Sequence, residues 1–185
     1  MGEIDDAIER ADREAFTRQP PKTLRARINF LMKQLRTTKA VAQEIGVSQR
    51  SVERYRKGER KHPPQAIAER IDAAVRQRWQ PQVRKRRQQQ AARTGGITVE
   101  TRARFGYTAP IGTTDDGRFR RLTVHLSPAY AQRLFDARNT GAGDQQMRAI
   151  IAEGFKDVYF QDGGARATGL SDVTLNDIDY LDLDY

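Results

Sequence analysis

The segment that most constrains the fold is residues 38–58, "TKAVAQEIGVSQRSVERYRKG", which has the spacing of a helix-turn-helix. Ala42 supplies a small residue where two helices must approach closely, and Gly46 follows where the turn needs a left-handed conformation. Ser48 is placed to cap the second helix, and Val52 begins its apolar face. Because these offsets occur together, the segment predicts a helix-turn-helix; the alternative is a helical hairpin with a basic surface.

A helix-turn-helix places its second helix in the major groove of DNA, where side chains reach the base edges. The exposed face of that helix is predicted to carry the base-reading side chains Gln49, Arg50, Ser51 and Arg54. Glutamine pairs bidentately with adenine and arginine with guanine, and each good pair discriminates by about 1–3 kcal/mol. Further cations are expected to contact phosphates: Lys39, Arg56, Lys57, Arg60 and Lys61.

The positive charge is concentrated in the first half of the chain. Residues 1–93 hold 23 Lys/Arg and 11 Asp/Glu, a net charge of +12, whereas residues 94–185 hold 10 and 13, a net charge of −3. The densest cluster is "RKRR", formed by Arg84, Lys85, Arg86 and Arg87. Such a cluster repels itself unless a polyanion neutralises it, so these residues are also predicted to bind DNA; solvated helix faces are the alternative.

Hydrophobic periodicity divides the chain into four segments. Residues 1–79 predict amphipathic helices around the helix-turn-helix, and residues 80–96 predict a basic linker or an extended basic helix. Residues 97–160 alternate like two strands and then turn helical, which predicts a β-hairpin followed by two helices. Residues 161–185 are Gly-rich and then acidic, which predicts a flexible tail that orders on a protein partner. The expected fold is a mostly α helix-turn-helix domain plus a small α+β domain.

Composition argues against several classes of protein. The chain has no cysteine and two histidines, which disfavours disulfides, thiolate metal sites and histidine-based metal sites. No apolar run approaches the roughly 20 residues needed to cross a bilayer. The opening "MGEIDDAIER" lacks the apolar core of a signal peptide. We therefore expect a soluble intracellular protein with no membrane partner and no metal ion of its own.

The second half carries a further pattern. "RRLTVHLSPAYAQRLFDARNTGAGDQQMRAIIAEGFKDVY" resembles the strand–helix–helix unit of ribbon-helix-helix DNA-binding proteins. In that family two chains pair their strands and outward strand residues enter the major groove. The resemblance implies a homodimer formed through this half, with Arg121, Thr123 and His125 pointing outward. The alternative is an ordinary α+β domain in which this strand belongs to an intramolecular sheet.

Over its full length the chain resembles the telomere terminal proteins of linear actinomycete chromosomes and plasmids. The resemblance rests on the order of an acidic N-terminal helix, "TTKAVAQEIGVSQRSVERYRKGERKHPP", "VRKRRQQQAARTGGITVETRARFGYTAP" and "IGTTDDGRFRRLTVHLSPAYAQRLFDARNTGAG". It implies a cytoplasmic, nucleoid-associated protein that is linked covalently to 5′ DNA ends and primes the synthesis that fills the terminal gap. It also implies three partners: telomeric DNA, a telomere-associated recruiting protein and a DNA polymerase.

The resemblance implies that a threonine hydroxyl accepts the first nucleotide, at Thr114 in this sequence. The surrounding "GTTDDG", residues 112–117, predicts a turn at a hairpin tip, since Asp-Gly is a strong turn signal. Thr113 is the alternative acceptor, and Asp115 and Asp116 either support the reaction or only form the turn. The chain would then be a primer and not an enzyme, without a cofactor, because the polymerase supplies Mg²⁺ and the dNTP.

Other assignments remain open at the level of the sequence. Tyr180 and Tyr185 lie in the predicted tail and offer hydroxyls of a second kind. A helix-turn-helix also fits a transcriptional regulator or a replication-initiator protein that is never linked to DNA. A nucleoid protein held to DNA by charge alone is a third alternative.

Overall fold

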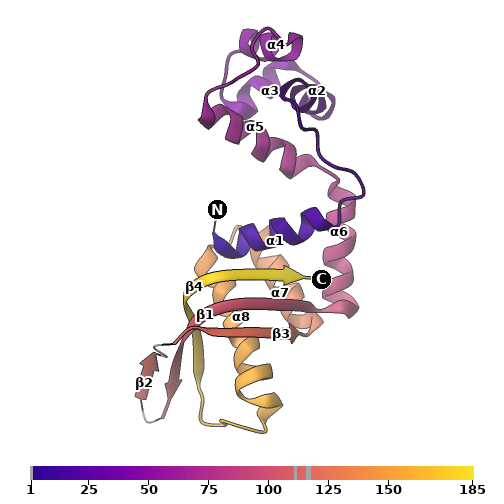
Figure 1. Ribbon diagram of the computed structural model, residues 1–185. Coiled ribbons are helices and arrows are strands. Elements are labelled where there is room, and N and C mark those ends of the chain that lie inside the picture. Colours follow the sequence, from indigo (N-terminus) through magenta and orange to yellow (C-terminus); the bar gives the residue numbers. More distant parts are fainter. Residues whose placement is uncertain (1, 111, 116–117) are drawn as a thin grey trace. The chain divides into compact units, whose positions relative to one another are not determined.

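The computed structural model describes residues 2–110, 112–115 and 118–185, with only the backbone described at 114 and 115. The chain is mixed α/β and divides into two compact units. The helical unit comprises Phe16–Pro81, and the sheet unit comprises Met1–Ala15 together with Gln82–Tyr185 (Figure 1). The first helix therefore belongs to the sheet unit, and not to the helical domain predicted for residues 1–79.

The helical unit contains four helices whose ends follow local sequence signals: α2 (Leu24–Leu35), α3 (Thr38–Ile45), α4 (Gln49–Lys57) and α5 (Gln65–Arg78). Thr23, Thr37 and Ser48 each accept a hydrogen bond from a backbone N–H of the first turn that follows. Gly46 and Gly58 end α3 and α4 in the left-handed conformation that glycine adopts without strain.

One hydrophobic core holds these four helices together. Its buried members come from every helix: Ile28, Leu31, Val41, Ala42, Ile45, Val52, Tyr55, Ile71, Ala74 and Val75. Trp79 packs edge-on against Phe30, with ring centroids 5.1 Å apart, and its indole N–H donates to the carbonyl of Arg18 at 3.1 Å. The backbone N–H of Thr17 donates to the side chain of Gln80. The two ends of the helical unit therefore lie side by side.

The sheet unit is built on a four-stranded antiparallel sheet with β1 (Ile97–Ala109) at its centre. Strand β4 (Asp172–Asp184) pairs with residues 98–108 of β1. The other edge of β1 pairs first with β3 (Arg120–Leu126) over residues 97–103 and then with β2 (Gly112–Asp115) over residues 106–109.

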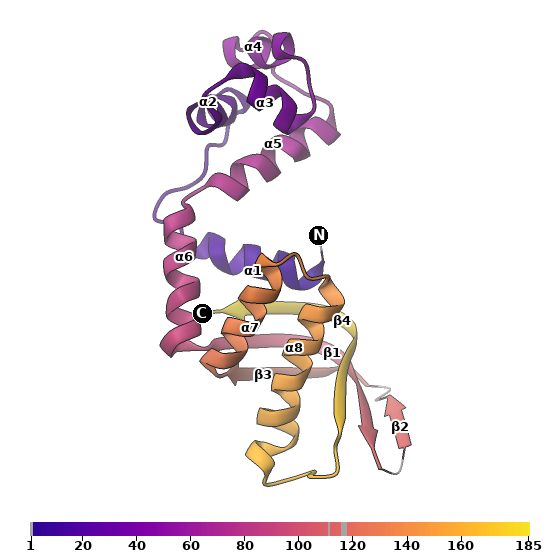
Figure 2. The same ribbon diagram turned by 180° about the vertical axis from the view of Figure 1, so that it is seen from behind.

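Helices cover one face of this sheet, as Figure 2 shows for α7 (Pro128–Asn139) and α8 (Asp144–Phe155). Helix α1 (Glu3–Glu14) packs beside β4, and α6 (Pro81–Gln90) continues into a π-helical turn, Ala91–Gly95. A second π-helical turn, Lys156–Phe160, and a short 3₁₀ turn, Asp162–Gly164, follow α8. The core combines alternate strand residues with the inner faces of these helices, and Phe105 and Phe155 are fully buried in it.

The acidic C-terminal segment is a strand, so the prediction of a flexible tail is wrong for residues 172–184. Its apolar residues alternate, and Val173, Leu175, Leu181 and Leu183 are buried in the core. The intervening aspartates lie on the other side of the strand, where several of them pair with arginines: Asp177 with Arg104, Asp179 with Arg102, and Asp182 with Arg10. Arginines of β1 and α1 thus neutralise a segment that looks disordered by composition.

The chain reverses earlier than the turn predicted at residues 112–117. Residues 112–115 pair with β1 as a strand, and the pairing of Ala109 with Gly112 places the chain reversal between these two residues. Proline presets the backbone angle that the first position of a turn needs, and Pro110 occupies that place. Asp116 and Gly117, the dipeptide behind the prediction, lie outside the described residues.

The structure decides between the alternatives given for residues 80–96 and for the pairing of β3. Most of the segment predicted as a basic linker or extended helix, residues 80–96, is helical. Strand β3 pairs with β1 of the same chain, as the ordinary α+β alternative requires. Arg121, Thr123 and His125 are exposed on the sheet face opposite the core, as alternation predicts.

Candidate nucleic-acid interface

The turn between α3 and α4 requires its glycine. Gly46 has φ 67° and ψ 43°, and its N–H donates to the carbonyl of Gln43 at 3.3 Å. The N–H of Val47 donates to the carbonyl of Ala42 at 2.9 Å, which closes the turn directly over the small residue. A Cβ at position 46 would lie 2.3 Å from a guanidinium nitrogen of Arg70. The left-handed backbone angle strains any larger side chain at this position, whereas the Arg70 guanidinium is the end of a flexible side chain and can move aside.

Helix α4 has a buried face and an exposed face. Val52 and Tyr55 are buried, while Gln49, Arg50 and Arg54 are exposed. Ser51 is only half-exposed; its N–H donates to the hydroxyl of Ser48, and the two hydroxyls lie 3.0 Å apart. The predicted reading face therefore keeps three of its four members available, with Ser51 partly engaged in the helix cap.

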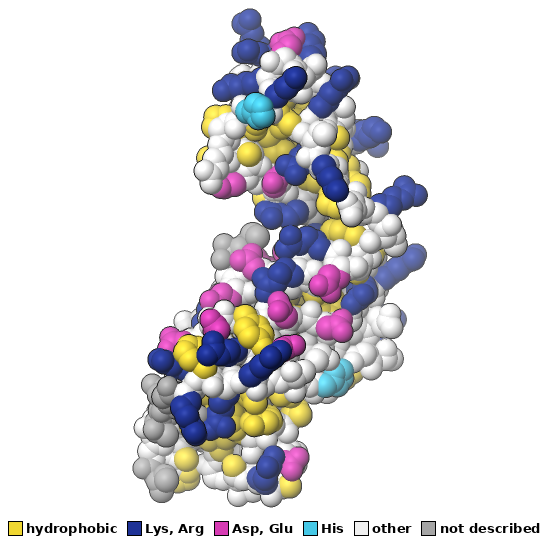
Figure 3. Space-filling view, in the orientation of Figure 1, with side chains coloured by type: hydrophobic (Ala, Val, Ile, Leu, Met, Phe, Trp, Pro, Cys, Tyr) yellow, Lys and Arg dark blue, Asp and Glu magenta, His cyan; other side chains and the backbone are white. Residues whose placement is uncertain are grey.

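The five cations expected to contact phosphates, Lys39, Arg56, Lys57, Arg60 and Lys61, are all exposed. Figure 3 shows Lys and Arg side chains clustered over this part of the helical unit.

Ion pairing differs among these cations. Among the described residues, Arg50, Arg56 and Lys57 have no ion-pair partner. Arg54 lies 3.7 Å from Glu59, with both side chains 51% exposed, so the pair contributes about 0–1 kcal/mol and a phosphate or base can displace it.

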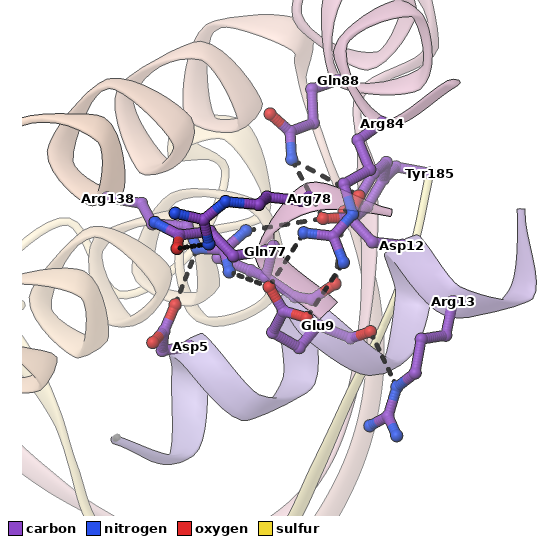
Figure 4. A network of polar contacts seen from close by, with 11 residues as sticks. Asp5, Glu9, Asp12, Arg13, Gln77, Arg78, Arg84, Gln88, Arg138 and Tyr185 are labelled. Atoms are coloured by element: carbon purple, nitrogen blue, oxygen red, sulfur yellow. Dashed lines mark hydrogen bonds and ion pairs between the residues drawn. The ribbon is translucent and has the colours of Figure 1, made fainter. Parts of the chain in front are cut away.

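The cluster at 84–87 does not present all its charges to solvent, and Arg84, predicted to contact DNA, is paired inside the sheet unit. Arg84 forms a two-pronged ion pair with Glu9, with both N–O distances 3.2 Å and its side chain only 12% exposed (Figure 4). Arg87 is held by Asp184, at 3.5 Å, and by the backbone oxygen of Tyr185. Lys85 and Arg86 remain exposed.

Arg84 belongs to a buried polar network that no sequence signal identified as such. Arg138 of α7 contacts three carboxylates of α1, those of Asp5, Glu9 and Asp12 (Figure 4). These acids recur at positions i, i+4 and i+7, which places them on one face of α1. That spacing is the signal that could have indicated a common cationic partner.

Charge pairing in this network shifts the pKa of Glu9. Burial alone raises the pKa of this carboxyl, but the guanidinium groups of Arg84 and Arg138 outweigh it, so the pKa lies below its ordinary value. Asp12 is fully buried and accepts hydrogen bonds from Gln88 and from the Tyr185 hydroxyl. The network thus joins α1 to α6, to α7 and to the end of β4.

The threonines proposed from sequence lie on the β1–β2 hairpin. The register places Thr113 opposite Thr108 and Thr114 opposite Tyr107. Thr113 is exposed, and its hydroxyl lies 3.2 Å from that of Thr108. The side chains of Thr114 and Asp115, and all of Asp116, lie outside the described part of the chain.

The hairpin extends beyond the end of β3, whose pairing with β1 stops at Ala103, and Figure 1 shows it projecting from the sheet.

The two tyrosines considered as alternative acceptors are both engaged. The hydroxyl of Tyr180 donates to Glu100 at 3.0 Å from within β4. That of Tyr185 donates to Asp12 at 2.7 Å, and burial raises the pKa of Tyr185. Neither side chain lies on a free tail.

Within residues 2–110, 112–115 and 118–185, no cluster of three or more His, Cys, Asp or Glu side chains could hold a metal ion. Over the same residues no helix has the length and apolar character needed to cross a membrane. Comparisons with protein-family models, with curated proteins and with solved structures gave no match for this chain.

Proposed function

We propose that the protein binds duplex DNA with α4 in the major groove. The observation that carries this proposal is the conjunction of the left-handed turn at Gly46, the buried contacts of Ala42 and Val52, and an exposed α4 face rich in arginine. The fold alone would also suit a helical hairpin. What favours DNA is that the exposed face carries long cationic and amide side chains, which are suited to base edges and phosphates.

The expected affinity has two components. Arg50 and Gln49 lie in the first turn of α4, which is the part of a recognition helix that contacts base edges. Each good bidentate contact discriminates by about 1–3 kcal/mol. The flanking cations contribute sequence-independent affinity, which falls as salt rises because the release of counterions from DNA is then less favourable.

The test is selection of preferred duplexes from a random pool with the full chain, followed by binding measurements on the preferred and a scrambled duplex. Arg50→Ala and Arg54→Ala should weaken binding to the preferred duplex more than to the scrambled one. Lys33→Ala, which removes an exposed cation from α2, is the charge-matched control. Equal losses on both duplexes would show that these arginines contact only phosphates.

We also propose, as a second function, that the β1–β2 hairpin presents a threonine hydroxyl as a primer for a partner DNA polymerase. The supporting observation is geometric: β2 and the end of β1 extend past the end of β3, with β4 paired along the other edge of β1 as far as Thr108, and β2 carries adjacent threonines. A hydroxyl on the outer edge of a projecting part of the sheet is what a polymerase cleft can receive in place of a primer 3′ end.

The chemistry needs no catalytic group of the chain itself. The threonine oxygen attacks the α-phosphorus of a dNTP, a phosphoester bond forms, the bond to the β-phosphate breaks and pyrophosphate leaves. The hydroxyl proton passes to solvent or to a base in the polymerase site, where two Mg²⁺ ions stabilise the attacking and leaving oxygens. The protein would act at telomeric DNA ends in the cytoplasm, brought there by a telomere-associated recruiting protein.

This second function is tested by incubating the chain with polymerase, recruiting protein, telomeric template and labelled dNTP. Label that survives heating in detergent is expected on the parent chain and on Thr113→Ala, and is expected to be lost in Thr114→Ala. Label on Thr114→Ala but not on Thr113→Ala would show that Thr113 is the acceptor. If the parent chain is never labelled, the primer proposal fails. A regulator or replication initiator is then the alternative, and footprinting of an internal duplex site would identify such a protein.

A further inference from the structure

Helix α6 divides its polar residues between two faces. Residues 84, 87, 88 and 91 follow helical spacing and point into the sheet unit. They comprise the paired Arg84 and Arg87, Gln88 bonded to Asp12, and the buried Ala91. These contacts fix the rotation of α6 about its own axis, and therefore fix which residues face solvent.

The opposite face carries exposed cations and amides: Lys85, Arg86, Gln89 and, in the following turn, Arg93. Residues 81–95 contain no acidic residue. Among the described residues, Lys85, Arg86 and Arg93 have no ion-pair partner. Figure 3 shows dark blue side chains projecting from the α6 side of this unit.

A groove of about 300 Å³ runs between this face and α7. Lys85, Gln89 and Arg93 line one wall, and Gln132 and Asn139 line the other. The acidic residue of the groove, Asp136, already accepts two hydrogen bonds of 2.8 Å from Gln132. The groove thus offers two cations and several amide groups to an anion, against a single hydrogen-bonded carboxylate.

We propose that this outer face of α6, with the groove beside it, is a second contact surface for the sugar–phosphate backbone of duplex DNA. Lys85 and Arg93 are separated by eight positions, or about 12 Å along a helix axis. Since phosphates recur about every 3.4 Å along the axis for each strand, this length spans roughly three to four of them. The surface has no base-reading geometry, so its contribution is affinity without sequence preference.

This inference rests on the proposed DNA binding and adds a second contact to the same ligand. It also distinguishes residues within one cluster: Lys85 and Arg86 bind DNA, whereas Arg84 and Arg87 stabilise the sheet unit. Because α6 begins directly after Trp79 and Gln80, chain connectivity tethers this surface to the end of the helical unit. DNA held by one surface then raises the local concentration of DNA at the other.

The test measures how the dissociation constant of the full chain for a mixed-sequence duplex depends on salt between about 50 and 200 mM. The triple variant Lys85→Ala/Arg86→Ala/Arg93→Ala should lower the slope of log affinity against log salt by about 0.9 for each lost phosphate contact. If the affinities of the parent chain and the variant converge near 1 M salt, the affinity at ~0.1 M salt falls about eightfold for each lost contact.

Arg166→Ala is the control, because it removes an exposed arginine whose side chain pairs with Asp162 and the carbonyl of Tyr159, both in its own loop. It should leave the slope unchanged. The triple variant should keep the parent melting temperature, since its three side chains make no buried contact. An unchanged slope in a folded triple variant would overturn the inference.

The two proposals fail in different ways. If Arg50→Ala retains full discrimination between duplexes while the α6 variant loses affinity, the α4 proposal fails and the α6 surface stands. If Arg50→Ala loses discrimination while the α6 variant binds like the parent, only the present inference fails.

Discussion

The assignment of the acidic C-terminal segment as a core strand makes a quantitative prediction. Leu181 is 2% exposed and lies opposite Thr101 in the β1–β4 ladder. Leu181→Ala removes this side chain from a closed core and should lower the free energy of unfolding of the sheet unit by about 2–5 kcal/mol. A domain is stable by only about 5–15 kcal/mol, so the loss is a large part of the total.

A matched substitution on the outer side of the same strand should do little. Asp179 pairs with Arg102 at 2.5 Å, but each side chain is 48% exposed. Solvent screens such a pair, and Asp179→Asn is therefore expected to change the stability by about 1 kcal/mol or less. A disordered acidic tail would show no such difference between its two sides.

The single tryptophan allows the two units to be followed separately. Trp79 packs in the helical unit, so its fluorescence reports unfolding there, while far-ultraviolet circular dichroism reports both units. In urea, Leu181→Ala should shift the dichroism transition of the sheet unit and leave the fluorescence transition in place. The reasoning is refuted if Leu181→Ala matches Asp179→Asn, or if the amides of residues 173–183 exchange hydrogen at unprotected rates.

Three further predictions follow from close contacts and charge. Gly46→Ala forces a left-handed alanine against Arg70 and should destabilise the helical unit by about 1–2 kcal/mol in a Trp79-monitored titration; an unchanged midpoint would contradict the turn geometry. The pKa of Glu9 in the folded protein lies below its unfolded value of about 4.3. The stability that ionised Glu9 contributes to the fold is therefore complete above about pH 4.3 and disappears as the pH falls through the folded pKa. Glu9→Gln should therefore flatten the acid limb of melting temperature against pH. Gly154→Ala would put a Cβ 2.7 Å from the methyl groups of Leu126, and thermal melting should show about 1–3 kcal/mol of overpacking.

Short-range signals in the sequence predicted the helix-turn-helix well. The caps, the turn glycine and the apolar stripe of residues 38–58 act over three or four positions, so each can be recognised without knowing what packs against it. The strand–helix–helix order of 97–160 follows from the same local periodicities. The outward position of Thr123 and the burial of Val124 needed only the two-residue alternation of a strand.

Such local signals do not predict which residues far apart in the sequence contact each other. Arg84 and Lys85 are adjacent cations, and only the position of Glu9, 75 residues away, makes the first a buried ion pair. The acidic segment looked disordered because composition does not show that β1 supplies arginines opposite its aspartates. The hairpin turn was misplaced because residues 112–115 pair with β1 as a strand, and local turn signals do not show that long-range register.

The sequence by itself determined the local elements: where helices begin and end, which face of each is apolar, and that the first half carries the positive charge. Only the tertiary structure decided which charges are neutralised inside the protein and which remain for a ligand. The physical reason is that an ion pair depends on the distance between two groups, and folding brings Glu9 to Arg84 and Asp179 to Arg102 across stretches of chain that no local pattern spans.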